Sequence, residues 1–174
     1  LKPNQILGLI GESGSGKTVL LKVMIGLYES DSGIVKYDNR NFTEMGFNNR
    51  KNLRKEIGML FQEGALFDYM TVEENIMFPL KMFSEKLNEE NLDRVNFCLN
   101  RVNLENTNHL FPSELSGGMK KRVAIARSIS LNPKYLFCDE PNSGLDPKTS
   151  ILIDNLIREI TQEYNITTIV NSHD

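Results

Sequence analysis

The sequence contains few cysteines, no long apolar run and no strong excess of one charge. It has 174 residues and 2 cysteines, Cys98 and Cys138, which lack the spacing of a metal-binding pair. We therefore expect two free thiols in a reducing compartment rather than a disulfide framework. No run reaches about 18 apolar residues, so the sequence predicts no transmembrane helix. No signal peptide is visible either.

Charge and length narrow the class of protein further. The formal net charge is −3 at pH 7, which gives no support for a nucleic-acid-binding surface, so no nucleic-acid partner is expected. A chain of 174 residues suits one compact domain with a sizeable core. Because strand-like runs lie close to both ends, we expect residues 1–174 to be a single domain cut from a longer protein.

The strongest motif is a phosphate-binding loop at residues 11–18, which read Gly-Glu-Ser-Gly-Ser-Gly-Lys-Thr. The apolar run 5–10 predicts a strand before this phosphate loop, and 19–25 predicts a helix after it, ended by Gly26. Glycines let backbone N–H groups surround phosphate oxygens, and the helix N-terminus adds positive charge. Lys17 would reach the β- and γ-phosphates, and the Thr18 hydroxyl would bind Mg²⁺. The predicted nucleotide contacts are Gly11, Ser13, Gly14, Ser15, Gly16, Lys17 and Thr18.

Further apolar runs predict strands at 57–61, 135–138 and 167–170. Each of these runs, like the run before the phosphate loop, leads into polar residues. Ligands bind at the carboxyl ends of strands in an open parallel sheet, so these residues would meet in one nucleotide pocket. A shorter strand is predicted at 34–37, followed by a surface helix or loop at 41–55.

Helical signals dominate between the strands at 57–61 and 135–138. Thr71 and Glu74 form a capping-box pattern that predicts a helix start. The run 87–102 places Leu92, Val95 and Leu99 at helical spacing, which predicts a second helix. Residues of approximately 63–130 are therefore expected to form an inserted helical subdomain.

Two acids follow the predicted strand at 135–138. Asp139 at a strand end could hold Mg²⁺, usually through its water shell, in the arrangement called Walker B. The next carboxylate, Glu140, is placed to orient or deprotonate an attacking water.

A second glycine-rich segment, Leu115-Ser116-Gly117-Gly118-Met119, precedes another helical pattern. Ser116 suits a helix N-cap, and Met119, Val123, Ala126 and Ile129 would lie on the buried face of the helix. Two glycines at a helix start leave backbone N–H groups free to bind an anion.

The phosphate loop, Gln62, this signature segment, Asp139-Glu140-Pro141 and His173, in this order, resemble the ATP-binding-cassette (ABC) ATPase family. The resemblance covers essentially the whole chain. It implies an α/β fold of the P-loop NTPase kind, with a mainly parallel sheet flanked by helices. It also implies ATP and Mg²⁺ as cofactors and two cassettes packed head to tail, with a homodimer expected.

Residue roles follow from the same resemblance. Ser116, Gly117 and Gly118 would contact the γ-phosphate held by the partner's phosphate loop. Gln62 would be the Q-loop residue, touching Mg²⁺ or water, and residues 143–146 would form the D-loop, with Asp146 at the dimer seam. His173 would contact the γ-phosphate. The expected catalytic residues are Glu140, His173, Gln62 and Lys17, and the expected metal ligands are Thr18, Gln62 and Asp139.

Two features depart from the family pattern. The family most often has Gln where this chain has Met119, which cannot donate a hydrogen bond. The family also has an aromatic residue before the phosphate loop that stacks on adenine, and residues 1–10 contain none. Met119 and the segment 61–68 resemble the Mla-type ATPases, which implies transport of phospholipid or another hydrophobic substrate with an MCE-domain partner.

The leading hypothesis is an ATPase subunit on the cytoplasmic face of a bacterial inner membrane, bound to an integral-membrane permease. The apolar residues Leu66, Phe67, Tyr69 and Met70 would suit that partner surface as well as ordinary core packing. One alternative is a soluble cassette in translation or DNA repair, although the sequence lacks the sustained heptads of a coiled coil. A small-molecule kinase is the third, and it would leave the signature segment unused.

Overall fold

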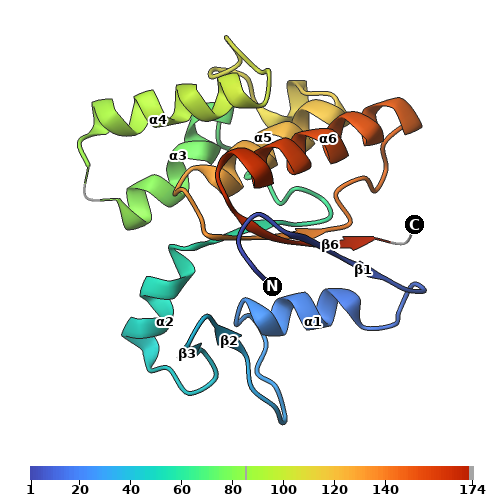
Figure 1. Cartoon of the computed structure of the whole chain (residues 1–174). Coiled ribbons are helices and arrows are strands. Elements are labelled where there is room, and N and C mark those ends of the chain that lie inside the picture. The colour runs from blue at the N-terminus through green and yellow to red at the C-terminus, as the bar shows by residue number, and fades with distance from the viewer. Residues whose placement is uncertain (85, 173–174) are drawn as a thin grey trace.

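The computed structural model describes residues 1–84 and 86–172, which fold around a parallel sheet (Figure 1). In this part of the chain the sheet has four strands in the order β1-β6-β5-β4, and every pairing is parallel. The carboxyl ends of the strands therefore lie at one edge, as the sequence predicts. These strands are β1 (Ile6–Ile10), β4 (Ile57–Leu60), β5 (Tyr135–Asp139) and β6 (Thr167–Ser172).

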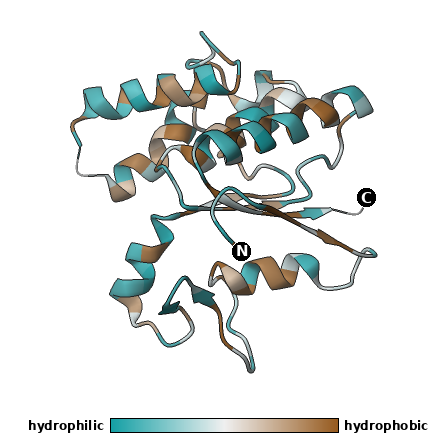
Figure 2. Ribbon diagram, in the orientation of Figure 1, coloured by the Kyte–Doolittle hydropathy of each residue, from teal (hydrophilic) through white to brown (hydrophobic). Residues whose placement is uncertain are grey.

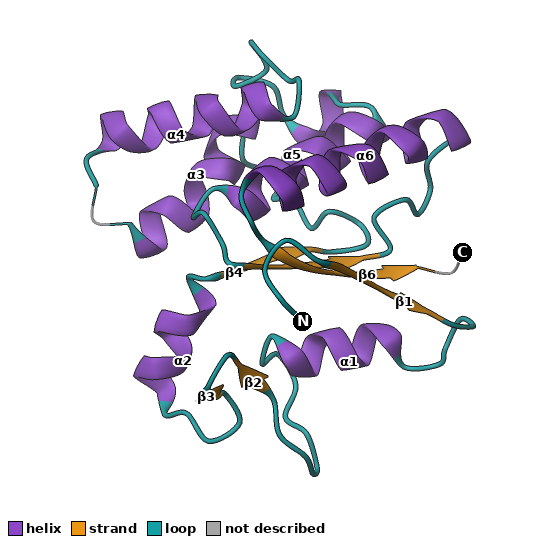
Figure 3. Ribbon diagram, in the orientation of Figure 1, coloured by secondary structure: helices purple, strands orange, loops and turns teal. Residues whose placement is uncertain are grey.

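Helices cover both faces of this sheet, which confirms the predicted α/β architecture (Figure 3). One face carries α1 (Lys17–Met24) and α2 (Phe47–Arg54). The other carries α3 (Val72–Phe83), α4 (Asn88–Arg101), α5 (Gly117–Ile129) and α6 (Pro147–Glu163), with a 3₁₀ turn at Pro112–Glu114 before α5. None of the described helices is both long and apolar enough to cross a membrane.

The side chains of the central strand β5 point alternately to the two faces of the sheet, which explains why helices cover both faces. Leu136 and Cys138 belong to the core shared with α3–α6, whereas Phe137 belongs to the core shared with α1 and α2. Successive side chains of a strand point to opposite faces, so a continuous apolar run must be covered twice. Figure 2 shows this hydrophobic strand layer between the two sets of helices.

The predicted cap at Thr71 and the predicted second helix are both present. Thr71 accepts a hydrogen bond from the Glu74 N–H at 3.2 Å, and Glu74 accepts one from the Thr71 N–H at 2.8 Å. In α4, Val95 and Leu99 are buried, whereas Leu92 is 37 % exposed. Asn91 is buried instead, because α4 turns the side of Asn91 and Val95 toward the helices that it packs against.

The predicted strand at 34–37 is also shorter than expected. Only β2 (Lys36–Tyr37) is regular, and it pairs antiparallel with β3 (Arg40–Asn41), which the sequence did not indicate. This hairpin lies outside the parallel sheet. Ile34 is 62 % exposed, so its apolar character did not place it in a strand.

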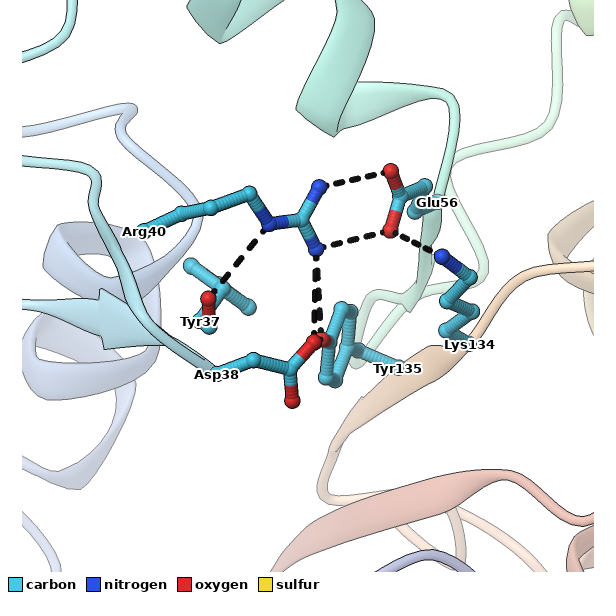
Figure 4. Close-up of polar contacts among 6 residues, drawn as sticks. All are labelled: Tyr37, Asp38, Arg40, Glu56, Lys134 and Tyr135. Carbon is cyan, nitrogen blue, oxygen red and sulfur yellow. Dashed lines mark hydrogen bonds and ion pairs between the residues drawn. The ribbon is translucent and has the colours of Figure 1, made fainter.

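A polar network joins the hairpin to the amino ends of β4 and β5 (Figure 4). Arg40 donates two hydrogen bonds to the Glu56 carboxylate, at 2.7 and 2.9 Å, and Lys134 lies 3.1 Å from the same carboxylate. Bidentate pairs of this kind add geometric specificity to charge attraction. The network therefore lies at the edge of the sheet opposite the carboxyl ends. Its members are Tyr37, Asp38, Arg40, Glu56, Lys134 and Tyr135.

Candidate functional site

The phosphate loop links β1 to α1 and depends on glycine at two positions. Gly14 and Gly16 have φ of 80° and 93°, and Gly16 is the N-cap residue of α1. A side chain is strained in this left-handed region, so glycine is the residue that allows this turn. Lys17 folds back over the loop, where its Nζ donates to the carbonyl oxygens of Gly11 at 2.6 Å and Glu12 at 2.9 Å.

Asp139 lies at the carboxyl end of β5 and is 3 % exposed. Its Oδ1 accepts a hydrogen bond from the Thr18 hydroxyl at 2.9 Å and another from the Asn171 side-chain amide. Thr18 is the second residue of α1. The fold thus brings two of the three predicted Mg²⁺ ligands, Thr18 and Asp139, together across 121 positions of sequence.

Asn171 was missed by the sequence reasoning. The strand predicted to end at Val170 continues to Ser172, and Asn171 pairs in register with Asp139 on β5 and with Leu9 on β1. Asparagine is depleted in strands, so it marked a strand end in the sequence. The signal that could have found it is a polar residue directly after an apolar run at the edge where the site was expected.

One cavity of about 290 Å³ brings the predicted groups together. Glu140, whose φ of 47° is in the left-handed region, reaches it directly after β5, and Gln62 reaches it after β4. The Gln62 side-chain amide donates to the Ser143 hydroxyl at 3.2 Å, so the residue predicted for the Q-loop contacts the segment predicted for the D-loop. The cavity is lined by Ser13, Gly14, Gly16, Lys17, Thr18, Val19, Gln62 and Glu140.

The signature segment lies outside this cavity. Ser116 is the N-cap of α5, as predicted, and its hydroxyl accepts a hydrogen bond from the Met119 N–H at 3.3 Å. Ser116 and Gly117 are exposed. A Cβ on Gly118 would come within 2.9 Å of the Thr149 methyl, so glycine permits the close approach of α5 to α6. The predicted anion-binding helix start therefore does not line the cavity at the chain's own phosphate loop.

The remaining predicted residues have separate positions. Asp146 is the N-cap of α6 and accepts a hydrogen bond from the Thr149 N–H at 3.0 Å. Hydrogen bonds from Thr149 keep the pKa of the Asp146 carboxyl below its ordinary value. His173 lies outside the described residues.

The residues present fit a magnesium ion with bound phosphate. Thr18 contributes a hydroxyl oxygen and Asp139 a carboxylate, and the buried Asn171 Oδ1 has no hydrogen-bond partner. Mg²⁺ prefers oxygen ligands and is usually held by one or two carboxylates together with water and phosphate oxygens. Within the described ranges no cluster of three or more His, Cys, Asp or Glu side chains forms a ready-made metal cage.

Comparisons with curated proteins give long matches. The methionine import ATP-binding protein MetN 2 of Bacillus cereus is 39% identical over 174 residues, which cover 100% of this chain and 51% of that protein. MetN of Carboxydothermus hydrogenoformans is 42% identical over 174 residues, again 51% of its length. The chain therefore spans about half the length of these relatives. They are named for methionine import, so the predicted Mla-type branch is not supported.

Solved structures agree with the fold. The dimeric post-hydrolysis state of the ATP-binding cassette MJ0796, bound to ADP and Pi, matches with a TM-score of 0.89 and 32% identity over 100% of this chain and 77% of that one. The cassette cbiO1 of Clostridium perfringens, part of the ABC transporter complex cbiONQ, matches with a TM-score of 0.88 and 33% identity, over 100% and 69% of the two chains.

The family itself follows from one further match. A family model described as ABC transporter matches residues 1–143, which is most of the chain. That range includes the phosphate loop, the signature segment and Asp139-Glu140, whose geometry is described above. The chain belongs to the ABC transporter family, as a cassette of its ATPase component.

Proposed function

We propose that this chain is the ATP-hydrolysing cassette of a membrane transporter. The observation that carries the proposal is the cavity that the phosphate loop lines together with Gln62 and Glu140. Thr18, which also lines this cavity, donates a hydrogen bond to Asp139. The similarity to a cassette bound to ADP and Pi supports nucleotide binding at this place.

Glu140 is the proposed general base. It would accept a proton from water as the water oxygen bonds to the γ-phosphorus, and the bond from that phosphorus to the bridging oxygen of ADP would break. Lys17 and the backbone N–H groups of the phosphate loop would stabilise the charge that develops on the phosphate oxygens. Gln62, which lines the same cavity, would help to orient the water.

Mg²⁺ is proposed as the second cofactor, held by Thr18 and Asp139 with Gln62 nearby. Such an ion neutralises charge on the β- and γ-phosphate oxygens. Asn171 would keep the Asp139 carboxylate in one orientation, because its amide donates to the same oxygen that accepts from Thr18.

The proposed assembly is a head-to-tail homodimer. Ser116, Gly117 and Gly118 are too remote from the chain's own cavity to line it, and their exposed helix start suits phosphate bound to a second copy. Asp146 would lie at the seam between the copies, and His173 would approach the γ-phosphate. MJ0796, a similar cassette, is dimeric.

A permease in the inner membrane is the proposed further partner, and the cassette would lie on its cytoplasmic side. Tyr69 is 75 % exposed after Gln62 and would contact the permease. Phe67 and Met70 are half-buried, and Leu66 packs against the core. The names of the curated relatives favour methionine as the transported solute over phospholipid carried with an MCE-domain partner.

Glu140→Gln tests the chemistry. The amide cannot accept the proton, so we expect ATP hydrolysis to fall by about 10²–10⁴-fold while ATP binding persists. Phosphate release and fluorescent-nucleotide titration of the full-length protein measure the two properties. Glu44→Gln, at an exposed position in a loop, is the matched control and should hydrolyse ATP as the wild type does. Turnover of Glu140→Gln close to that of the control would remove Glu140 from this role.

The partner and the solute need a separate experiment. Full-length Glu140→Gln protein, isolated from native membranes with ATP, should retain a polytopic permease. Methionine uptake that depends on ATP in vesicles containing this complex would support the solute. An MCE-domain protein in the complex, with movement of labelled phospholipid, would instead favour the lipid branch. Recovery with ribosomes or DNA alone would overturn the transporter assignment.

A further inference from the structure

Lys121 is a charged side chain buried inside the cassette. It lies on α5 and is 6 % exposed. The carboxylates of Glu63, Glu140 and Asp139 attract its ammonium electrostatically. Its Nζ donates to the main-chain oxygen of Gln62 and lies 3.5 Å from that of Glu140. A buried charge requires such partners, and here they come from two separate loops.

The two loops that Lys121 spans are also joined to each other. The Glu140 carbonyl oxygen accepts a hydrogen bond from the Ser143 N–H at 3.1 Å. The Gln62 side chain donates to the Ser143 hydroxyl at 3.2 Å. Lys121 therefore closes a ring of hydrogen bonds that contains the proposed base, the Q-loop residue and the D-loop.

A second cation of α5 contacts the same Q-loop turn. Arg127 donates to the carbonyl oxygens of Gly64 at 2.6 Å and Ala65 at 2.8 Å. Both residues have positive φ, of 75° and 49°, so their peptide groups are held in an unusual turn. The backbone of this turn must consequently move with α5 unless these contacts break.

We infer that Lys121 is a positioning residue that couples the two ATP sites of the cassette dimer. The inference rests on the proposed function. Ser116, Gly117 and Gly118 begin α5 and would contact ATP on the partner, whereas Gln62 and Glu140 serve the chain's own ATP. A shift of α5 caused by the partner's phosphate would reach both peptide groups through the one ammonium that contacts them.

Lys121→Met tests this inference, because it keeps the length of the side chain and removes the ammonium. ATP hydrolysis by the full-length dimer is measured against ATP concentration, and nucleotide affinity is measured separately. We expect kcat to fall by about tenfold, which is about 1.4 kcal/mol of barrier, and the sigmoidal dependence on ATP to become hyperbolic. Nucleotide affinity should stay close to that of the wild type.

Two variants complete the test. Lys121→Arg restores a cation and should recover kcat and the sigmoidal dependence. Lys120→Met, one position away on α5, is the matched control and should behave as the wild type. If Lys121→Met does not fold, the same comparison is made with Lys121→Gln, whose shorter polar side chain should show the same losses.

The outcomes separate the inference from the proposed function. A folded Lys121→Met or Lys121→Gln variant with unchanged kcat and an unchanged sigmoidal dependence overturns the inference alone. A hyperbolic dependence of the wild-type ATPase rate on ATP concentration also overturns the inference, because the two ATP sites are then not coupled. The proposed function as an ATPase would be unaffected by that result. A wild-type protein without ATPase activity overturns the proposed function and this inference together.

Discussion

One buried amide, Asn171, orients the carboxylate on which the proposed metal site depends. It pairs in register with Asp139 and donates to the same carboxylate oxygen that accepts from Thr18. Its own Oδ1 is buried without a partner, which is costly for a polar atom.

Replacement of Asn171 should therefore affect metal dependence more than stability. Leucine has a similar volume and removes both the hydrogen bond to Asp139 and the unpaired oxygen. We expect Asn171→Leu to change the free energy of unfolding by about 1 kcal/mol or less. The Mg²⁺ concentration for half-maximal ATP hydrolysis should rise several-fold.

Urea unfolding and Mg²⁺ titration of ATPase activity measure the two effects of Asn171→Leu. Thr167→Val, on the same strand β6 but at its amino end, is the control and should leave the Mg²⁺ dependence unchanged. An unchanged Mg²⁺ titration of Asn171→Leu would contradict this orienting role.

At the scale of elements, the end of α1 determines where the hairpin packs. Gly26 has a φ of 74° and follows the helix, and the Leu27 N–H donates to the Lys22 carbonyl at 2.8 Å. This arrangement is a Schellman motif, in which glycine is the residue after the cap. The Phe42 ring, directly after β3, lies where a Cβ of residue 26 would be, at 2.5 Å.

Gly26→Ala should accordingly destabilise the fold more than a glycine-to-alanine substitution at a position that has positive φ but no nearby side chain. The left-handed backbone and the clash with Phe42 together should cost about 2–5 kcal/mol of unfolding free energy. Gly33→Ala is the matched control, because Gly33 has a φ of 94° and no atom within 4 Å of the added Cβ. It should cost only about 1–2 kcal/mol. Equal losses in chemical denaturation would show that the contact with Phe42 does not matter.

At the scale of the whole molecule, the cassette is held together at both edges of its sheet. Groups at the carboxyl edge form the nucleotide cavity, and the Arg40 and Glu56 network at the amino edge ties the hairpin to β4 and β5. The hydrogen bonds from Arg40, followed by those from Lys134, hold the pKa of the Glu56 carboxyl below its ordinary value, although burial opposes them.

The lowered pKa of Glu56 predicts part of the acid sensitivity of the fold. A carboxyl with a lowered folded-state pKa contributes stability above its unfolded pKa and loses that contribution as the pH falls through the folded value. The wild type should therefore lose more stability than Glu56→Gln when the pH falls below about 4.3, the ordinary value for Glu. At pH 7 the variant should be less stable by about 1–2 kcal/mol, since the pair is partly exposed.

Denaturant unfolding from neutral to acid pH measures this difference between the wild type and Glu56→Gln. Glu29→Gln, at an exposed position outside the network, should follow the wild type at every pH. If the free energy of unfolding fell equally with pH in the wild type and in Glu56→Gln, the ion pair would make no contribution to the acid sensitivity of the fold.

Local patterns allowed much of the architecture to be predicted. The phosphate loop between a strand and a helix, the caps at Thr71 and Ser116, and the helix end at Gly26 are confirmed. Each depends on neighbouring residues alone. The boundary of a helical subdomain at 63–130 and the roles of the site residues stay predictions.

Tertiary structure decided what depends on residues far apart. The hydrophobic spacing in α4 did not show that Leu92 faces solvent, because exposure depends on which helices lie beside it. Likewise no local signal gives the contacts of Asn171 and Lys121, since one acts through a neighbouring strand and the other through two loops. The sequence by itself determined which groups could bind phosphate, because that chemistry requires glycine, lysine and acid at short spacing. Only the folded sheet determined which buried polar groups hold them in place, because those contacts join segments that are neighbours in space alone.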